Sequence, residues 1–167
     1  MIAIKVYRII TYILLPFAAL FSLIALFTLL VALANPQLFL PLFLMICVVL
    51  YVFGSFNFLQ KAIIKMQECK PFLRDFITVN AIVATVFAAS GILQFIQLNM
   101  NPAIMHKTLE QAMAMQQPNA PANVLPMMHS IMSVTLYIIL VLSILLLVHI
   151  FLSFRLMKSF KHAFTKN

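Results

Sequence analysis

Charge is what this sequence has least of. Only 8% of its 167 residues are charged and three are acidic, whereas 65% are hydrophobic. A soluble domain has about 25% charged and about 45–50% apolar residues. A soluble core of this length could not enclose so much apolar surface, so a soluble globular domain is excluded and lipid is the expected solvent.

The charges are absent from four long intervals. No Asp, Glu, Lys or Arg occurs in residues 9–34, 38–60, 76–98 or 128–154. A helix needs about 20 apolar residues to cross a bilayer. Only helices and closed barrels bond their whole backbone internally in lipid, and these runs lack the alternation of a barrel. We therefore predict an all-α membrane protein with four transmembrane helices, forming a single domain over residues 1–167.

A basic interval, residues 61–75, divides the four segments into two pairs. Asn35-Pro36 follows the first apolar run and Asn101-Pro102 follows the third. Proline removes a backbone donor and disfavours helix at the preceding residue, so both pairs predict helix ends. We expect the helix of the second segment to continue through Lys61–Gln67, until Pro71 interrupts it. The predicted fold is two antiparallel hairpins, joined by the hinge at 61–75 and carrying an outer loop at 99–127.

The distribution of basic residues predicts the orientation. Ten of the eleven Lys and Arg residues lie at the two termini or in the hinge, and only Lys107 lies in the outer loop. By the positive-inside rule, the hinge and both termini are cytoplasmic, as in a bacterial inner-membrane protein.

The net charge of +8 would suggest nucleic acid in a soluble chain. Here the basic residues flank apolar segments, where they orient helices and attract anionic head groups, so we expect the lipid bilayer and no nucleic acid as partner. The expected lipid contacts are Lys61, Lys65, Lys70, Arg74, Arg155, Lys158 and Lys161.

Small residues recur at helical spacing in the third segment. They are Ala81, Ala84, Thr85, Ala88, Ala89 and Gly91. Small side chains let helices approach closely in a membrane, where the hydrophobic effect no longer drives association. We expect this segment to be the best-packed helix, although alanine is also simply common in membrane helices.

Recognisable catalytic chemistry is missing. The sequence contains no nucleophile motif, HExxH, P-loop or dinucleotide fingerprint. The four segments contain no Asp, Glu, Lys or Arg, and such ionisable groups mark proton relays or ion paths. The segments do contain His149 and, at the start of the fourth segment, His129. Cys47 and Cys69 differ in expected depth and form no CxxC pair, so no disulfide is predicted. We expect no enzymatic activity and no cofactor.

Four polar residues are candidates for an intramembrane cluster: Tyr12, Asn57, Asn80 and His149. Counting inward from the basic boundaries places them at similar depth, with Thr11 close by. Polar groups in lipid are costly unless paired, so we expect some of them to meet inside the bundle. They could form a polar chamber for a head group, a quinone or an ion, or interhelical bonds that only fix packing.

Methionine and histidine gather in and beside the outer loop. The candidate metal ligands are Met105, His106, Met113, Met115, Met127, Met128 and His129. Thioether sulfur and imidazole suit Cu(I). Methionine is also a flexible apolar filler at adaptable packing or partner surfaces, and only one MxM spacing occurs here.

These observations favour an interaction role. The leading hypothesis is a non-enzymatic integral membrane protein that serves as an accessory, assembly or interaction subunit of a membrane complex, or that forms a homo-oligomer. One alternative is a small transporter or channel-like protein using the polar level of Asn57, Asn80 and His149. The other is Cu(I) or small-molecule binding by the Met- and His-rich loop.

Overall fold

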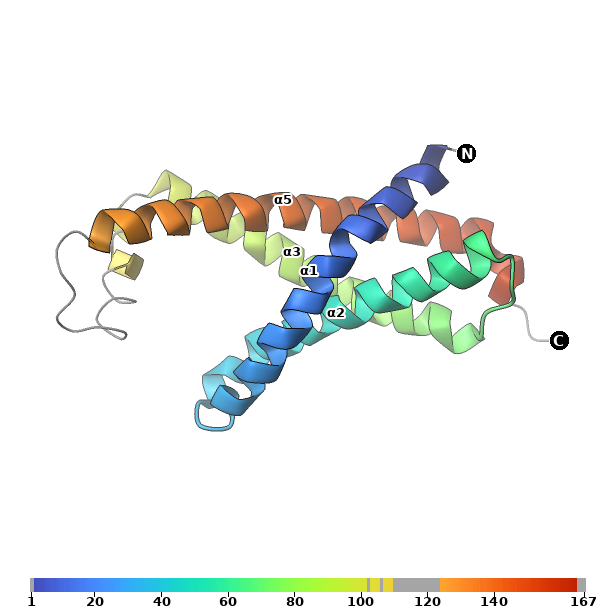
Figure 1. Cartoon of the computed structure of the whole chain (residues 1–167), viewed down its shortest axis with the longest axis horizontal. Helices are drawn as coiled ribbons and strands as arrows, with labels where there is room; N and C mark the ends of the chain where they lie inside the picture. The colour runs from blue at the N-terminus through green and yellow to red at the C-terminus, as the bar shows by residue number, and fades with distance from the viewer. Residues whose placement is uncertain (1, 102, 106, 110–123, 165–167) are drawn as a thin grey trace. The chain divides into compact units, whose positions relative to one another are not determined.

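Four long helices dominate the described part of the chain, and Figure 1 labels each of them. The computed structural model describes residues 2–101, 103–105, 107–109 and 124–164, and these contain no strand. The long helices are α1 (Ile2–Ala32), α2 (Phe39–Phe58), α3 (Pro71–Met100) and α5 (Val124–Ser159). Each belongs to a segment long and apolar enough to cross a membrane. The predicted all-helical protein with four candidate spans is therefore confirmed at this level.

Both expected Asn-Pro breaks lie at helix ends. α1 ends at Ala32, and the Asn35 side chain then accepts the backbone N–H of Gln37 at 3.3 Å. Pro36 begins the short 3₁₀ helix η1 (Pro36–Leu38), which leads into α2. α3 ends at Met100, immediately before the second Asn-Pro pair. Proline cannot continue the hydrogen-bond ladder of the preceding helix, which explains both ends.

The hinge differs from the expectation. α2 passes into a π-helix, η2 (Leu59–Ile64), and the regular structure ends there instead of reaching Pro71. The chain turns at Met66, whose φ of 52° lies in the left-handed region. Pro71 is the first residue of α3. A proline is tolerated there because the N–H of a first-turn residue has no partner within the helix.

The contacts divide the chain into two compact units. The first comprises Met1–Ala88 with Leu145–Asn167, and the second comprises Ala89–Ile144. Within the second unit, Leu98, Met105 and Leu136 form a buried apolar cluster with Phe95 and Met132 packed on it. The helices α3 and α5 each contribute residues to both units.

The first unit is packed most closely around α2. Tyr7, near the start of α1, bonds to Ser55 near the end of α2, while Ala32 at the end of α1 contacts Leu42. Gly54 of α2 faces Ile77 of α3. The second span buries 44% of its most apolar window against 33% for the third. α2 rather than α3 is therefore the most buried span, because α1, α3 and α5 all contact it.

The expected small-residue stripe nevertheless points inward. Ala81, Ala84 and Ala88 are fully buried in the first unit, and Gly91 is buried in the second. These four residues recur at spacings of three and four, so they share one face of α3. Ala89 and Thr85 are exposed.

The C-terminal segment lies against the hinge. The backbone N–H of Cys69 donates to the carbonyl of Ala163 at 2.7 Å, in the 3₁₀ helix η3 (Lys161–Phe164). Phe164 stacks on Phe58 with ring centroids 5.5 Å apart. These contacts place the hinge and the C-terminal segment on the same side of the first unit.

Gly91 provides a test of the close helix contact in the second unit. A Cβ atom at Gly91 would lie 2.7 Å from Ser143 Oγ and 3.2 Å from Ile139 Cγ2 of α5. We expect Gly91→Leu to destabilise the protein by about 1–3 kcal/mol, since added atoms force a packed contact apart. Thermal unfolding in bicelles measures the effect. Ala89→Leu, at an exposed position two residues away, is the matched control. Equal shifts for the two variants would contradict the contact.

Candidate functional site

Three helices of the first unit each supply two polar side chains one turn apart. The pairs are Tyr7 and Thr11 of α1, Tyr51 and Ser55 of α2, and His149 and Ser153 of α5. Residues spaced by four share a helix face, so each pair can point to the same place. All six residues are at most 1% exposed. They form what we call the His149 network.

The imidazole of His149 lies at its centre. Nε2 is 2.8 Å from Thr11 Oγ1, and Nδ1 is 2.8 Å from the Tyr51 hydroxyl. The Tyr7 ring stacks on the imidazole, with centroids 4.5 Å apart and planes 9° from parallel. Tyr51 presents its ring at 80° to the imidazole plane. The ring is therefore fixed by one hydrogen bond at each nitrogen and by aromatic contacts.

Counting protons assigns a direction to these bonds. The Thr11 hydroxyl donates to the backbone carbonyl of Tyr7 at 2.7 Å, which uses its only proton. His149 Nε2 must then carry a hydrogen and donate to Thr11. In a neutral imidazole the other nitrogen accepts, so Tyr51 donates to Nδ1.

The remaining hydroxyls follow the same direction. Ser153 Oγ lies 2.9 Å from the Tyr51 oxygen and 3.3 Å from the Tyr7 oxygen, and it can donate to either. The Tyr7 hydroxyl donates to the Ser55 carbonyl at 3.2 Å. The chain of donors thus ends at two backbone carbonyls. Ser55 Oγ is the one buried side-chain N or O atom without a hydrogen-bond partner within the described part of the chain.

The structure distributes the predicted polar residues differently. Only His149 of the four candidates enters the network, together with Thr11. Asn80 is buried, but its Nδ2 donates to the Phe76 carbonyl of its own helix at 2.8 Å. Asn57 is exposed, and Tyr12 is 47% exposed and accepts a bond from Gln60 at 3.3 Å.

Sequence reasoning missed four members of the network, namely Tyr7, Tyr51, Ser55 and Ser153. The signal that could have found them is the recurrence of polar residues at i and i+4. This spacing occurs at Tyr7 and Thr11, and again in both other pairs. The spacing fixes a common face, whereas depth alone does not.

The candidate metal ligands are only partly described. Met105 is buried against Leu98 and Leu136, where its sulfur serves apolar packing. Met127, Met128 and His129 are consecutive in α5, so they point about 100° apart around the axis and cannot converge on one ion by themselves. His106, Met113 and Met115 lie outside the described residues. Cu(I) binding stays a prediction.

The basic residues expected at the lipid surface are exposed. They all belong to the first unit: Lys61, Lys65, Lys70, Arg74, Arg155, Lys158 and Lys161. Arg74 lies 3.6 Å from Asp75, and an exposed pair of this kind contributes at most about 1 kcal/mol. In the hinge, burial raises the pKa of the Cys69 thiol, and the nearby Lys61 charge opposes that shift.

No protein-family model, curated protein or solved structure matches the chain. The chemistry of the His149 network therefore follows from its own atoms. It contains an imidazole and hydroxyls but no carboxylate, and its members lie within hydrogen-bonding distance of one another across three helices. This arrangement can hold α1, α2 and α5 at a fixed rotation.

Removing one hydroxyl tests the energetic weight of the network. Tyr51→Phe leaves His149 Nδ1 without its donor, and we expect a loss of about 1–2 kcal/mol in unfolding free energy. Tyr137→Phe, at a 57% exposed position of α5, removes the same atom as a control. Equilibrium unfolding in bicelles provides the comparison. Equal losses for both variants would show that the network is energetically unimportant.

The proton count makes a spectroscopic prediction. We expect ¹⁵N NMR of histidine-labelled protein in nanodiscs at pH 7 to show His149 neutral, with its proton on Nε2. Thr11→Val removes the acceptor of that proton, and the proton should then move to Nδ1. Tyr51 can accept it there by turning its own hydroxyl toward Ser153. A wild-type proton on Nδ1 would contradict the assigned direction.

Proposed function

We propose that this protein is a non-enzymatic accessory, assembly or interaction subunit, acting in a larger membrane complex or as a homo-oligomer. The observation that carries the proposal is the closed His149 network. Its buried side chains are used to join helices to one another, with the Ser55 hydroxyl as the exception. A cluster whose polar groups bond to one another across helices serves to hold a rigid helix assembly.

The proposed topology is two antiparallel hairpins with the hinge and both termini in the cytoplasm of a bacterial inner membrane. The paired contacts of Tyr7 with Ser55 and of Ala32 with Leu42 support an antiparallel α1–α2 pair. The Cys69–Ala163 bond supports a common side for the hinge and the C-terminal segment. The basic residues gathered at this end support its cytoplasmic location.

Transport receives less support from these contacts. A polar path would need the side chains of Asn57, Asn80 and His149 to line one aqueous cavity. Instead, Asn57 is exposed on the outside of α2, Asn80 bonds to its own helix, and His149 is enclosed. These placements therefore do not support a common chamber lined by the three side chains.

Exposed apolar helix faces provide the surface for interaction. Only 17% of the most apolar window of α1 is buried within the protein, and only 11% of that of α5. On α1 the exposed side chains include Phe27, Leu30 and Val31. Lipid chains or partner helices must cover such faces in a membrane, and a subunit that binds other helices needs surface of this kind.

The proposal is tested by gentle detergent extraction of the tagged protein from its native membrane, followed by native-size analysis and mass spectrometry. A photo-crosslinking residue at Leu30, which is 64% exposed, reports direct neighbours, and one at the buried Ala25 is the control. We expect stoichiometric companions, or copies of this chain, crosslinked from Leu30 and not from Ala25. A particle containing a single copy of this chain, with lipid adducts alone at Leu30, would refute the proposal.

A further inference from the structure

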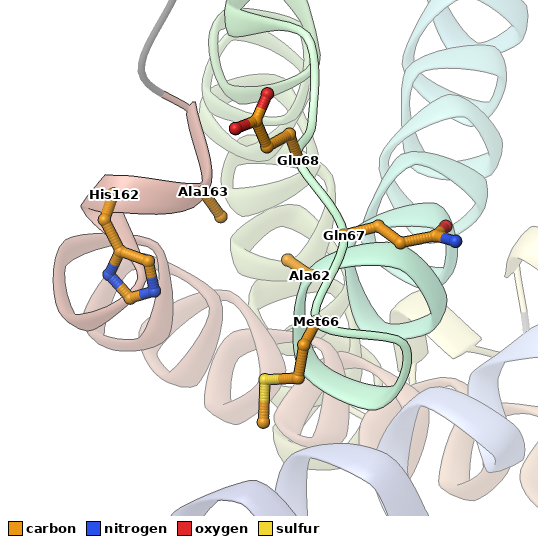
Figure 2. Close-up of a pocket in the computed structure, with 6 residues that line it drawn as sticks. All are labelled: Ala62, Met66, Gln67, Glu68, His162 and Ala163. Carbon is orange, nitrogen blue, oxygen red and sulfur yellow. The ribbon is translucent and has the colours of Figure 1, made fainter.

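A small, partly open pocket lies between the hinge and the C-terminal segment (Figure 2). Its volume is about 240 Å³. The lining residues come from η2, the hinge and η3, and they are Ala62, Met66, Gln67, Glu68, His162 and Ala163. Figure 2 shows the side chains of Glu68 and His162 on either side of Ala163, while Gln67 turns away. The lining thus combines two alanines and a methionine with one amide, one carboxylate and one imidazole.

The backbone around the pocket is irregular at two points. The π-helix Leu59–Ile64 contributes Ala62 to the lining, and Met66, also in the lining, has a φ of 52°. A left-handed conformation costs a residue with a side chain about 1–2 kcal/mol. Strained residues and π-helical turns both concentrate at functional sites. Here they occur together on one cavity.

Two backbone hydrogen bonds hold this irregular shape. The Gln67 N–H reaches back to the Lys61 carbonyl at 2.9 Å, and the Cys69 N–H donates to Ala163 at 2.7 Å. The second bond ties the hinge to the C-terminal segment across the pocket. Two segments that meet at residues 94 positions apart in the sequence therefore help to shape the same cavity.

The position of the pocket in the chain indicates that it lies near the lipid head groups. It begins where the apolar span of α2 ends, beside the exposed residues Lys61 and Lys65, and Lys161 precedes its C-terminal wall. Lysines immediately beyond a span lie at the level of the lipid head groups. The pocket is also smaller than the range of about 300–1,000 Å³ usual for drug-sized ligands, which favours a small polar group.

The charges select the ligand. Glu68 is the only acidic residue of the lining. Three lysines adjoin lining residues in the sequence: Lys61 precedes Ala62, Lys65 precedes Met66 and Lys161 precedes His162. A purely anionic ligand would meet the carboxylate, and a simple cation would meet the lysines. A zwitterion with an ammonium and a phosphate complements both. We propose that the pocket binds a phosphoethanolamine group, with its ammonium on Glu68 and its phosphate on the flanking lysines.

The same group occurs in phosphatidylethanolamine and in soluble phosphoethanolamine esters. Phosphatidylcholine carries the same net charge but has three methyl groups in place of N–H donors. Because a carboxylate bonds most strongly to a charged N–H donor, the pocket should distinguish the two lipids. Phosphatidylglycerol lacks the ammonium altogether and tests the lysines alone.

The experiment uses the full-length protein in nanodiscs containing phosphatidylethanolamine, phosphatidylcholine and phosphatidylglycerol in equal amounts. Native mass spectrometry then counts the lipids retained after gentle release. We expect phosphatidylethanolamine to be retained over phosphatidylcholine by about tenfold, the scale of one charge-assisted hydrogen bond. Glu68→Gln should abolish this preference. Asp75→Asn removes an equal charge at an exposed position outside the pocket lining and should leave it intact.

Three outcomes would overturn the proposal. They are equal retention of phosphatidylethanolamine and phosphatidylcholine by the wild type, a preference for phosphatidylglycerol, and an equal loss in Asp75→Asn and Glu68→Gln. Competition with soluble glycerophosphoethanolamine separates the two sources. Displacement of the retained lipid identifies a soluble ester as the ligand, and its absence identifies the membrane lipid.

Discussion

The structure depends on one constraint: a polar group that leaves water for lipid must find its partner inside the protein. His149 meets this constraint with a hydroxyl at each ring nitrogen, Thr11 on one side and Tyr51 on the other. Because these partners come from α1 and α2, satisfying one imidazole fixes three helices at once. Rotating any of the three would leave a buried donor or acceptor without a partner, which costs about 1–3 kcal/mol.

The helix α3 is attached to the first unit by a different means. α3 presents Ala81, Ala84 and Ala88 to the interior of the first unit, and Gly54 of α2 approaches Ile77 closely. Small residues gain their energy from close contact of backbones and many weak dispersion interactions. The first unit therefore combines directional bonds among α1, α2 and α5 with shape-dependent packing of α3.

The features that depend only on composition and on position along the chain could be predicted from the sequence. The four candidate spans follow from intervals without charge, and the breaks at Asn35-Pro36 and Asn101-Pro102 follow from proline chemistry. Depth counting also brought Thr11 and His149 to the same level. These inferences need only position along the chain.

Rotation about the helix axis was harder to infer. Asn57 lies six residues after Tyr51, and at 100° per residue it points about 120° away from it, whereas Ser55 lies within about 40°. Similar depth therefore could not show that Asn57 faces outward and Tyr51 inward. The left-handed turn at Met66 had no glycine to indicate it, and Pro71 was compatible with either a helix end or a helix start.

The neutrality of the His149 network shapes what the rest of the protein can do. A buried ion pair would require compensation for desolvation at each charge, whereas hydroxyls and a neutral imidazole satisfy one another at a smaller cost. The network thus fixes the helices without placing charge in the spans. Polarity and charge are then concentrated at the hinge end of the first unit, where the exposed lysines, Glu68 and the pocket lie. In the interaction role proposed above, the apolar faces of α1 would recognise a neighbour through shape, and chemical selectivity would come from the hinge.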